Sequence, residues 1–223
     1  MSKVQWSFSA LKTFEQCPKK YYHLKVAQDV QDSAGSAAAY GLRFHQSAED
    51  YGRDKKRLPI EFKGHKKLLD TLLAIPGENY YEMKLGLRKT DSGYEECDFD
   101  DETRWYRGIA DLVIIDGKKG YSIDYKTGKS ARYADIRQLD AVAAALCIKF
   151  PDLDVIKSAL AYTECNDFIR KTHYRENLDS YLGRFNKPLD ELESSFESGV
   201  WNAKTSPLCG WCPVVECEHH IER

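Results

Sequence analysis

Residues 108–115 read GIADLVII and residues 121–129 read YSIDYKTGK, and these two stretches decide the fold. Both are rich in β-branched and apolar side chains, which predicts two strands joined by a short turn. Each strand carries one carboxylate, Asp111 or Asp124. A carboxylate in a buried strand is unfavourable unless a positive group meets it, so the pair predicts a divalent-cation site. The alternative is two strand-end aspartates whose oxygens accept backbone N–H groups.

Lys126 follows Asp124 by two positions, so both side chains point to the same face of the strand. An ammonium there can orient an attacking water, lower the pKa of that water or offset charge that develops on a phosphate. The alternative is a surface lysine before a turn. The order aspartate, hairpin and D-x-K resembles the core of the PD-(D/E)XK nuclease superfamily.

Further motifs occur in the order found in the RecB-like branch of that superfamily, which includes CRISPR-associated and phage exonucleases. Residues 7–21, SFSALKTFEQCPKKY, resemble the opening motif of the branch, and Gly41 to His45 resemble its helical G-x-x-x-H. Gln138 matches the start of its Q-x-x-x-Y motif, but Val142 stands where the tyrosine is expected. A role of that tyrosine therefore does not carry over to this chain.

The resemblance implies roles for the residues of the predicted site. His45 is implied as a metal ligand on a helix, and the backbone carbonyl of Tyr125 as a further ligand. Gln138 is implied to contact DNA or the scissile phosphate. Glu82, on the strand before the hairpin, is expected either as another acidic member or as a half-exposed strand residue. Carboxylate oxygens favour Mg²⁺ or Mn²⁺, and an imidazole shifts the preference toward Mn²⁺.

Four of the seven cysteines match a second metal-binding pattern. Cys209, Cys212 and Cys217 form C-x₂-C-x₄-C near the C-terminus, and the resemblance adds Cys17 as the fourth ligand of a [4Fe–4S] cluster that ties the chain ends together. Thiolates also suit zinc. Zn²⁺ at these cysteines, with His219 or His220 as a further ligand, is the alternative.

The remaining patterns predict an α/β fold with a central mixed sheet flanked by helices. Further strands are expected over 80–88, 104–116, 120–126, 154–163 and 167–174. Helices are expected over 10–24, 34–51, 61–75, 133–149 and 177–199. Ser9 is the expected N-cap of the first helix, and Pro18 is expected to perturb it. We expect one nuclease domain over 1–223, in which the first helix and the tail 201–223 form the cluster-binding region.

The net charge of −2 does not by itself indicate a DNA-binding protein. Residues 95–102, EECDFDDE, carry six acids and are expected in an exposed loop or hairpin tip. A basic cluster is expected around the site, from Lys118, Lys119, Lys126, Lys129, Arg132 and Arg137. The sequence has no apolar run of transmembrane length and no secretory signal pattern, so we expect a cytoplasmic protein without a membrane partner.

These observations predict a divalent-metal-dependent deoxyribonuclease that hydrolyses phosphodiester bonds. The resemblance implies an exonuclease that acts on DNA ends, with single-stranded DNA as the expected substrate. Protein partners in recombination or repair are a further expectation. The alternative from another class is a catalytically idle nucleic-acid-binding module of a recombination or CRISPR adaptation complex.

Overall fold

The computed structural model describes residues 4–32 and 35–221, and the chain divides into two compact units. The sheet unit comprises Gly35–Arg184, and the terminal unit comprises Met1–Ala34 together with Phe185–Arg223. The terminal unit thus combines both ends of the chain. The expectation that residues 1–223 form a single nuclease domain stays a prediction.

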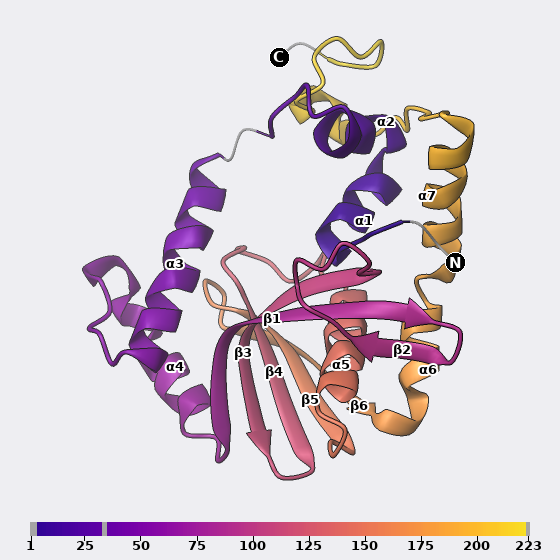
Figure 1. The fold of residues 1–223 in the computed structure, drawn as a ribbon. Coiled ribbons are helices and arrows are strands. Elements are labelled where there is room, and N and C mark those ends of the chain that lie inside the picture. Colours follow the sequence, from indigo (N-terminus) through magenta and orange to yellow (C-terminus); the bar gives the residue numbers. More distant parts are fainter. Residues whose placement is uncertain (1–3, 33–34, 222–223) are drawn as a thin grey trace. The chain divides into compact units, whose positions relative to one another are not determined.

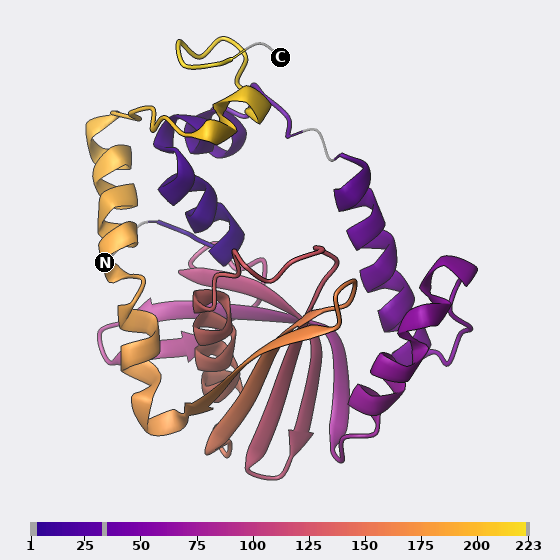
Figure 2. The ribbon, with the colours of Figure 1, turned by 180° about the vertical axis from the view of Figure 1, so that it is seen from behind.

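The sheet unit is built on one six-stranded sheet with the strand order β2-β1-β3-β4-β5-β6 (Figures 1 and 2). Its strands are β1 (Glu78–Thr90), β2 (Gly93–Glu96), β3 (Tyr106–Asp116), β4 (Lys119–Lys126), β5 (Val155–Tyr162) and β6 (Asp167–Tyr174). Strands β4 and β5 pair in parallel, whereas the other neighbouring pairs are antiparallel. The predicted α/β fold with a mixed sheet is confirmed.

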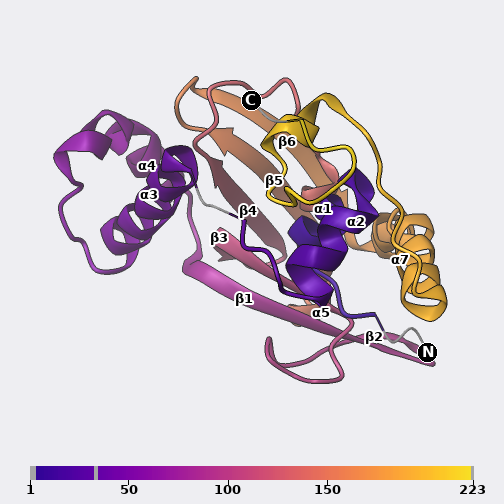
Figure 3. The same ribbon diagram turned by 90° about the horizontal axis from the view of Figure 1, so that it is seen from above.

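Helices cover both faces of this sheet (Figure 3). One face carries α3 (Ser36–Arg53), a 3-10 helix (Ile60–His65) and α4 (Lys66–Leu73). The other face carries α5 (Arg137–Lys149). After β6 the chain continues with a 3-10 helix (Arg175–Asn177) and α6 (Leu178–Gly183). On the α3 side, Phe44 packs in one core with Leu112 and Ile123. On the α5 side, Leu139 packs with Leu160. Among the residues that the structure describes, no helix is long and apolar enough to cross a membrane.

Three predicted boundaries in the sheet unit were wrong. The helix predicted over 61–75 is a 3-10 turn followed by the shorter α4. The helix predicted over 133–149 begins only at Arg137, and just before it the Asp135 carboxylate accepts the Arg137 backbone N–H at 3.1 Å. The acidic stretch 95–102 has its first two residues in strand β2, and only 97–102 lie in the loop before β3. The first residue expected for the helix at 34–51, Ala34, lies outside the described residues.

A buried carboxylate holds α5 in place on the sheet. Asp140 of α5 has an exposed fraction of 0% and lies 2.9 Å from the ring of His173 on β6. Lys171 and Arg184 also pair with this carboxylate. Burial alone would raise the pKa of Asp140, but the hydrogen bonds from His173 and Lys171 lower it below its ordinary value. The charged network therefore fixes the helix whose first turn reaches the predicted site.

The terminal unit differs from the prediction at both ends of the chain. It contains α1 (Phe8–Gln16), α2 (Pro18–Tyr21), a π-helix (Tyr22–Val26), α7 (Asn186–Ser198) and a 3-10 helix (Pro207–Trp211). The cap of α1 is Ser7 rather than Ser9, because the Ser7 hydroxyl accepts the Ala10 backbone N–H at 3.3 Å. The helix predicted over 10–24 is interrupted at extended Cys17 and a second helix begins at Pro18, so the expected perturbation by Pro18 is present.

The single helix predicted over 177–199 is likewise divided into α6 and α7. In the terminal unit, α1 and α7 lie side by side (Figure 1). An aromatic cluster closes this unit around Trp201, whose ring contacts the rings of Phe14, Tyr21, Tyr22 and Phe196. Residues from the two ends of the sequence therefore share one small core.

We predict that Gly86→Ala destabilises the protein by about 1–3 kcal/mol, as overpacking of a buried site does. A Cβ at Gly86 of β1 would lie 2.6 Å from the Cys97 carbonyl oxygen and 2.8 Å from that of Asp98, and neither backbone atom can rotate away. Gly64→Ala is the matched control, because a Cβ there meets nothing within 4 Å. Urea unfolding measures the stability of both variants, and equal stability of the two would contradict this packing.

Candidate metal centre

Three adjacent strands each bring one carboxylate to the same part of the sheet. Glu82 of β1 lies in register opposite Asp111 of β3, between the pairs Tyr81↔Leu112 and Met83↔Ala110. The ladder between β3 and β4 ends at Leu112↔Ile123, one residue before Asp111 and Asp124. Both aspartates therefore lie just beyond the last pair between β3 and β4, where these two backbones no longer pair, although Asp124 still pairs with Leu160 of β5.

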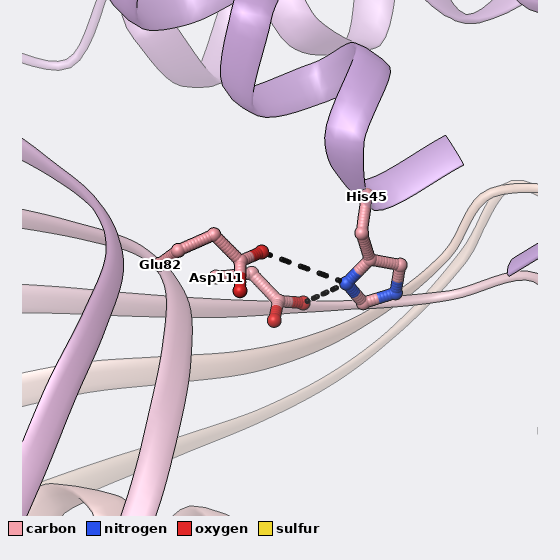
Figure 4. A group of neighbouring side chains, drawn as sticks. All are labelled: His45, Glu82 and Asp111. Carbon is pink, nitrogen blue, oxygen red and sulfur yellow. Dashed lines mark ion pairs between the residues drawn. The ribbon is translucent and has the colours of Figure 1, made fainter. Parts of the chain in front are cut away.

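Helix α3 adds a histidine to this group (Figure 4). The His45 Nδ1 lies 3.3 Å from Oδ2 of Asp111 and 3.9 Å from Oε1 of Glu82. The helix can approach the end of β4 because residue 41 is glycine, and even a Cβ there would lie 3.1 Å from Thr127 Oγ1. The ring of Tyr125 meets the imidazole edge to face at 6.2 Å, which restricts its orientation.

Tyr125 contributes its backbone to the same group. Its N–H donates to Asp111 Oδ2 at 2.6 Å, because the β3 ladder has already ended and offers no backbone acceptor. In a strand, the N–H and the C=O of one residue point to the same side. The Tyr125 carbonyl therefore points toward the side of Asp111, as its expected role as a ligand requires.

Asp124 belongs to a second set of contacts on the side of α5. Lys126 Nζ lies 2.6 Å from Asp124 Oδ2 and donates to Gln138 Oε1 at 3.0 Å, and the Gln138 amide donates to Asp124 Oδ1. These three residues thus form a closed triangle. Asp124 Oδ2 is buried, and the Lys126 ammonium is its charged partner.

Glu82 occupies an unfavourable position in two respects. Its backbone φ of +47° lies in the left-handed region, which costs a residue other than glycine about 1–3 kcal/mol. Burial raises the pKa of its carboxyl to about 7, and the charge of Asp111 adds to that shift. Such an arrangement persists only where the surrounding structure holds it, and it aims the side chain at His45 and Asp111.

The pKa values of Asp124, His45 and Tyr106 are also shifted by burial and by the nearby charges. Burial raises the pKa of Asp124, with Asp111 adding to the shift and Lys126 opposing it. Burial lowers the pKa of His45, but its hydrogen bond to Asp111 and the nearby carboxylates outweigh burial and raise it overall. Tyr106, fully buried near Asp124, has a pKa raised by burial and by that charge. The position of Tyr106 beside Asp124 was not predicted. A Cβ at Gly108 would meet the Tyr106 side chain, so a glycine at this position leaves room for it.

The donor set fits a hard divalent cation. Within the described part of the chain, His45, Glu82 and Asp111 are the group of at least three His, Cys, Asp or Glu residues whose ligand atoms all lie within 4.8 Å of one another. Two carboxylates and one imidazole match the preferences of Mg²⁺ and Mn²⁺. Asp124 lies outside this close group, although the sequence predicted it as one of two principal ligands.

The expected basic cluster around the site is not formed as predicted. Lys118 and Lys119 lie at the opposite end of β4 from Lys126, about 20 Å away along a strand of eight residues. Lys118 pairs there with Asp154. Arg137 is occupied by Asp135 at 2.7 Å. The predicted hairpin already implied this separation, because Lys118 and Lys119 lie at its turn and Lys126 lies at the far end of the strand expected over 120–126.

The four cysteines predicted as cluster ligands come together in the terminal unit. They line one pocket, whose volume is about 30 Å³: Cys17, Cys209, Cys212 and Cys217. Backbone N–H groups point at two of the sulfurs, from Lys204 to Cys17 Sγ and from Ser206 to Cys209 Sγ, each at 3.4 Å. His219 and His220 line the same pocket. Cysteine sulfurs that accept N–H groups are typical of ligated thiolates.

Comparisons with known proteins agree with this architecture. The family model of the PD-(D/E)XK nuclease superfamily matches residues 5–217. A solved structure of a protein from Eubacterium rectale, named as a candidate exonuclease, aligns with a TM-score of 0.55 and 14% identity over 95% of this chain and 88% of that chain. The structure of protein SSO0001 aligns with a TM-score of 0.45 and 10% identity over 97% of this chain and 87% of that chain. No curated protein sequence matches the chain.

We predict that Glu82→Gln stabilises the metal-free protein by about 1–2 kcal/mol at pH 8 and abolishes its stabilisation by Mn²⁺. The pKa of Glu82 is raised in the folded state, so the ionised carboxylate destabilises the fold fully above pH 7, and this effect disappears as the pH falls below about 4.5. The stabilisation of the metal-free protein by Glu82→Gln should therefore be smaller at pH 5 than at pH 8.

Thermal unfolding with and without Mn²⁺ measures both effects. Glu176→Gln, on an exposed glutamate of the 3-10 helix after β6, is the matched control and should change neither. A Glu82→Gln variant that Mn²⁺ stabilises as strongly as it stabilises the unaltered protein would remove Glu82 from the ligand set.

Proposed function

Because the chain belongs to the PD-(D/E)XK nuclease superfamily, we propose that it is a divalent-metal-dependent deoxyribonuclease that hydrolyses phosphodiester bonds. The observation that carries the proposal is the group of His45, Glu82 and Asp111 beside the contact between Asp124 and Lys126. A nuclease of this kind needs ligands for a cation and an ammonium next to them, and the contacts of these five residues support both roles.

The proposed roles follow from the contacts of each residue. His45, Glu82 and Asp111 hold Mg²⁺ or Mn²⁺, with Asp124 and the Tyr125 carbonyl as further ligands. The bound ion supplies Lewis-acid stabilisation of charge on the phosphate. Lys126 sits against Asp124 and presents its ammonium to the same phosphate, where it offsets developing charge.

Gln138 has a positioning role in this proposal. It contacts both Asp124 and Lys126, so it fixes the distance between a carboxylate and the ammonium that must address one phosphate. The Asp140 network that anchors α5 keeps Gln138 at this place. Contact of Gln138 with the DNA itself is a further part of the proposal.

We propose further that the protein is an exonuclease of the RecB-like type, acting on ends of single-stranded DNA. The ordered motifs of the sequence support this assignment, from residues 7–21 to Cys217. The Eubacterium rectale structure shares the fold, and its name as a candidate exonuclease is compatible with the proposal. The rival is a catalytically idle nucleic-acid-binding module of a recombination or CRISPR adaptation complex, and the intact D-x-K lysine argues against it.

The cysteine pocket is proposed to hold a [4Fe–4S] cluster. A single tetrahedral Zn²⁺ with Zn–S bonds of about 2.3 Å would place its sulfurs about 3.8 Å apart. Zn²⁺, with His219 or His220 as a further ligand, stays the alternative, because those two side chains line the same pocket. The cluster would join Cys17 to the C-terminal trio and so fasten both chain ends within the terminal unit.

Asp124→Asn and Lys126→Ala should each lower cleavage at least about 100-fold, as the loss of one electrostatic contact in an active site does. DNA binding should largely survive, because phosphate contacts are distributed over several residues. Lys118→Ala, at the far end of β4, is the control and should cleave normally. The measurement is Mn²⁺-dependent release of nucleotides from single and double strands labelled at the 5′ or 3′ end.

Each outcome of this assay bears on the proposal. Nucleotide release from one labelled end supports an exonuclease and reveals its polarity. Absence of release from every substrate by the unaltered protein would establish the idle module instead. Normal cleavage by both variants would refute the proposed roles of Asp124 and Lys126.

For the cysteine pocket we expect about four irons per chain in protein purified without oxygen. Cys17→Ser should lose iron and melt at a lower temperature, because the cross-link closes a loop of nearly the whole chain, worth about 5 kcal/mol in the chain-entropy model. Cys165→Ser, on an exposed cysteine outside the pocket, is the matched control. Zinc instead of iron would overturn the iron assignment, and unchanged metal content and melting temperature in Cys17→Ser would overturn the pocket as a metal site.

A further inference from the structure

A large groove lies on the sheet face that carries α4, over the strands that α3 and α4 leave uncovered. Its volume is about 810 Å³, and it is lined by residues of α4, β4, β5 and β6. All of these elements belong to the sheet unit. A cavity of this size is within the range of about 300–1,000 Å³ that small-molecule sites occupy, and it is open along one side of the sheet.

The floor and wall of the groove are apolar and aromatic. The floor is formed by Tyr121, Ile123 and Phe168, and the wall by Leu68 and Leu72 of α4. Arg170 packs over Phe168, with its guanidinium carbon 4.7 Å from the centroid of the Phe168 ring. A planar guanidinium over an aromatic ring presents a flat cationic surface on which a further planar group can stack.

The charged side chains that line the groove are lysines and an arginine. Lys67, Lys157 and Arg170 are exposed, and no carboxylate within 4 Å pairs with any of these three in the described part of the chain. The groove residues within the described ranges 4–32 and 35–221 include no aspartate or glutamate. Lys171 also lies at the border of the groove, but its ammonium pairs with the buried Asp140 and does not add a free charge to the groove. The occupant that complements this surface is an anion with apolar or aromatic parts.

One end of the groove adjoins the proposed metal centre. Thr163, which lines the groove, follows β5 and donates both its backbone N–H, at 2.9 Å, and its hydroxyl, at 3.3 Å, to the carbonyl of Lys126. Along β4, Tyr121 and Ile123 alternate with Asp124 and Lys126, so the groove floor and the Lys126 ammonium lie on opposite faces of this strand. An extended ligand that starts at Lys126 reaches the groove by passing around the ends of β4 and β5, where Thr163 meets the Lys126 carbonyl.

We infer that this groove binds a single strand of nucleic acid continuous with the strand whose phosphate lies at Lys126. The inference rests on the proposed function, because the metal centre supplies the other end of the path. Bases stack on aromatic rings and guanidinium planes, whereas phosphates contact lysines at the rim, and the groove offers both. A duplex presents its bases only at groove edges and cannot use the apolar floor.

The test compares two double variants that change the net charge equally. Lys157→Glu with Arg170→Glu alters the groove, and Lys118→Glu with Lys187→Glu alters paired cations elsewhere. Both are made in the Asp124→Asn background and assayed in EDTA by fluorescence anisotropy with labelled oligothymidylates of 4 and 20 nucleotides. Thermal unfolding of each variant checks that it is folded.

The groove variant should bind the 20-mer at least about 10-fold more weakly than the control variant, with the slope of log K against log salt reduced by about 1.4 for two lost phosphate contacts. Binding of the 4-mer should differ by less than about 3-fold. Equal affinity of both variants for the 20-mer would overturn the inference. Displacement of the 20-mer by polyglutamate at equal concentration would also overturn it and would assign the groove to an acidic polypeptide.

The outcomes separate the groove from the proposed function. If the unaltered protein releases no nucleotides while the groove variant still loses the 20-mer, the nuclease proposal fails and the groove stands. If the unaltered protein cleaves DNA while the two double variants bind alike, only the groove inference fails.

Discussion

Repulsion among carboxylates is the constraint on which this structure depends. Glu82, Asp111 and Asp124 come from three adjacent strands, and His45 and Lys126 are the positive side chains that pair with them. Burial is the largest cause of the raised pKa of Glu82, and the negative charge of Asp111 adds to it. A fold that maintains this arrangement sacrifices stability, and binding of a divalent cation would recover it.

The rest of the sheet unit serves to hold that arrangement. The ladder between β3 and β4 ends where the aspartates begin, so Asp111 accepts the N–H of Tyr125 in place of a strand partner. Gly41 lets α3 approach closely enough to bring His45 over the sheet. On the other face, the buried Asp140 anchors α5 and with it Gln138. The two helices thus reach the same strand ends from opposite faces of the sheet.

Much of this arrangement could be predicted because its signals are local. The apolar runs around Asp111 and Asp124 defined β3 and β4, and the spacing of D-x-K placed two side chains on one face. The division of 177–199 into two helices could not be predicted, because it depends on packing of α7 with α1. Nor could the closeness of Glu82 to His45 be derived, because it depends on a left-handed backbone at Glu82 and on the register of β1 with β3.

The central claim is that His45, Glu82 and Asp111 together bind a divalent cation. A crystal structure of the protein grown with Mn²⁺, with an anomalous difference map recorded at the manganese absorption edge, tests it most directly. The account predicts one strong peak about 2.0–2.3 Å from a nitrogen of His45 and from a carboxylate oxygen of Asp111, with Glu82 in contact. A map with no peak among these three residues, at a Mn²⁺ concentration that supports cleavage, would contradict it.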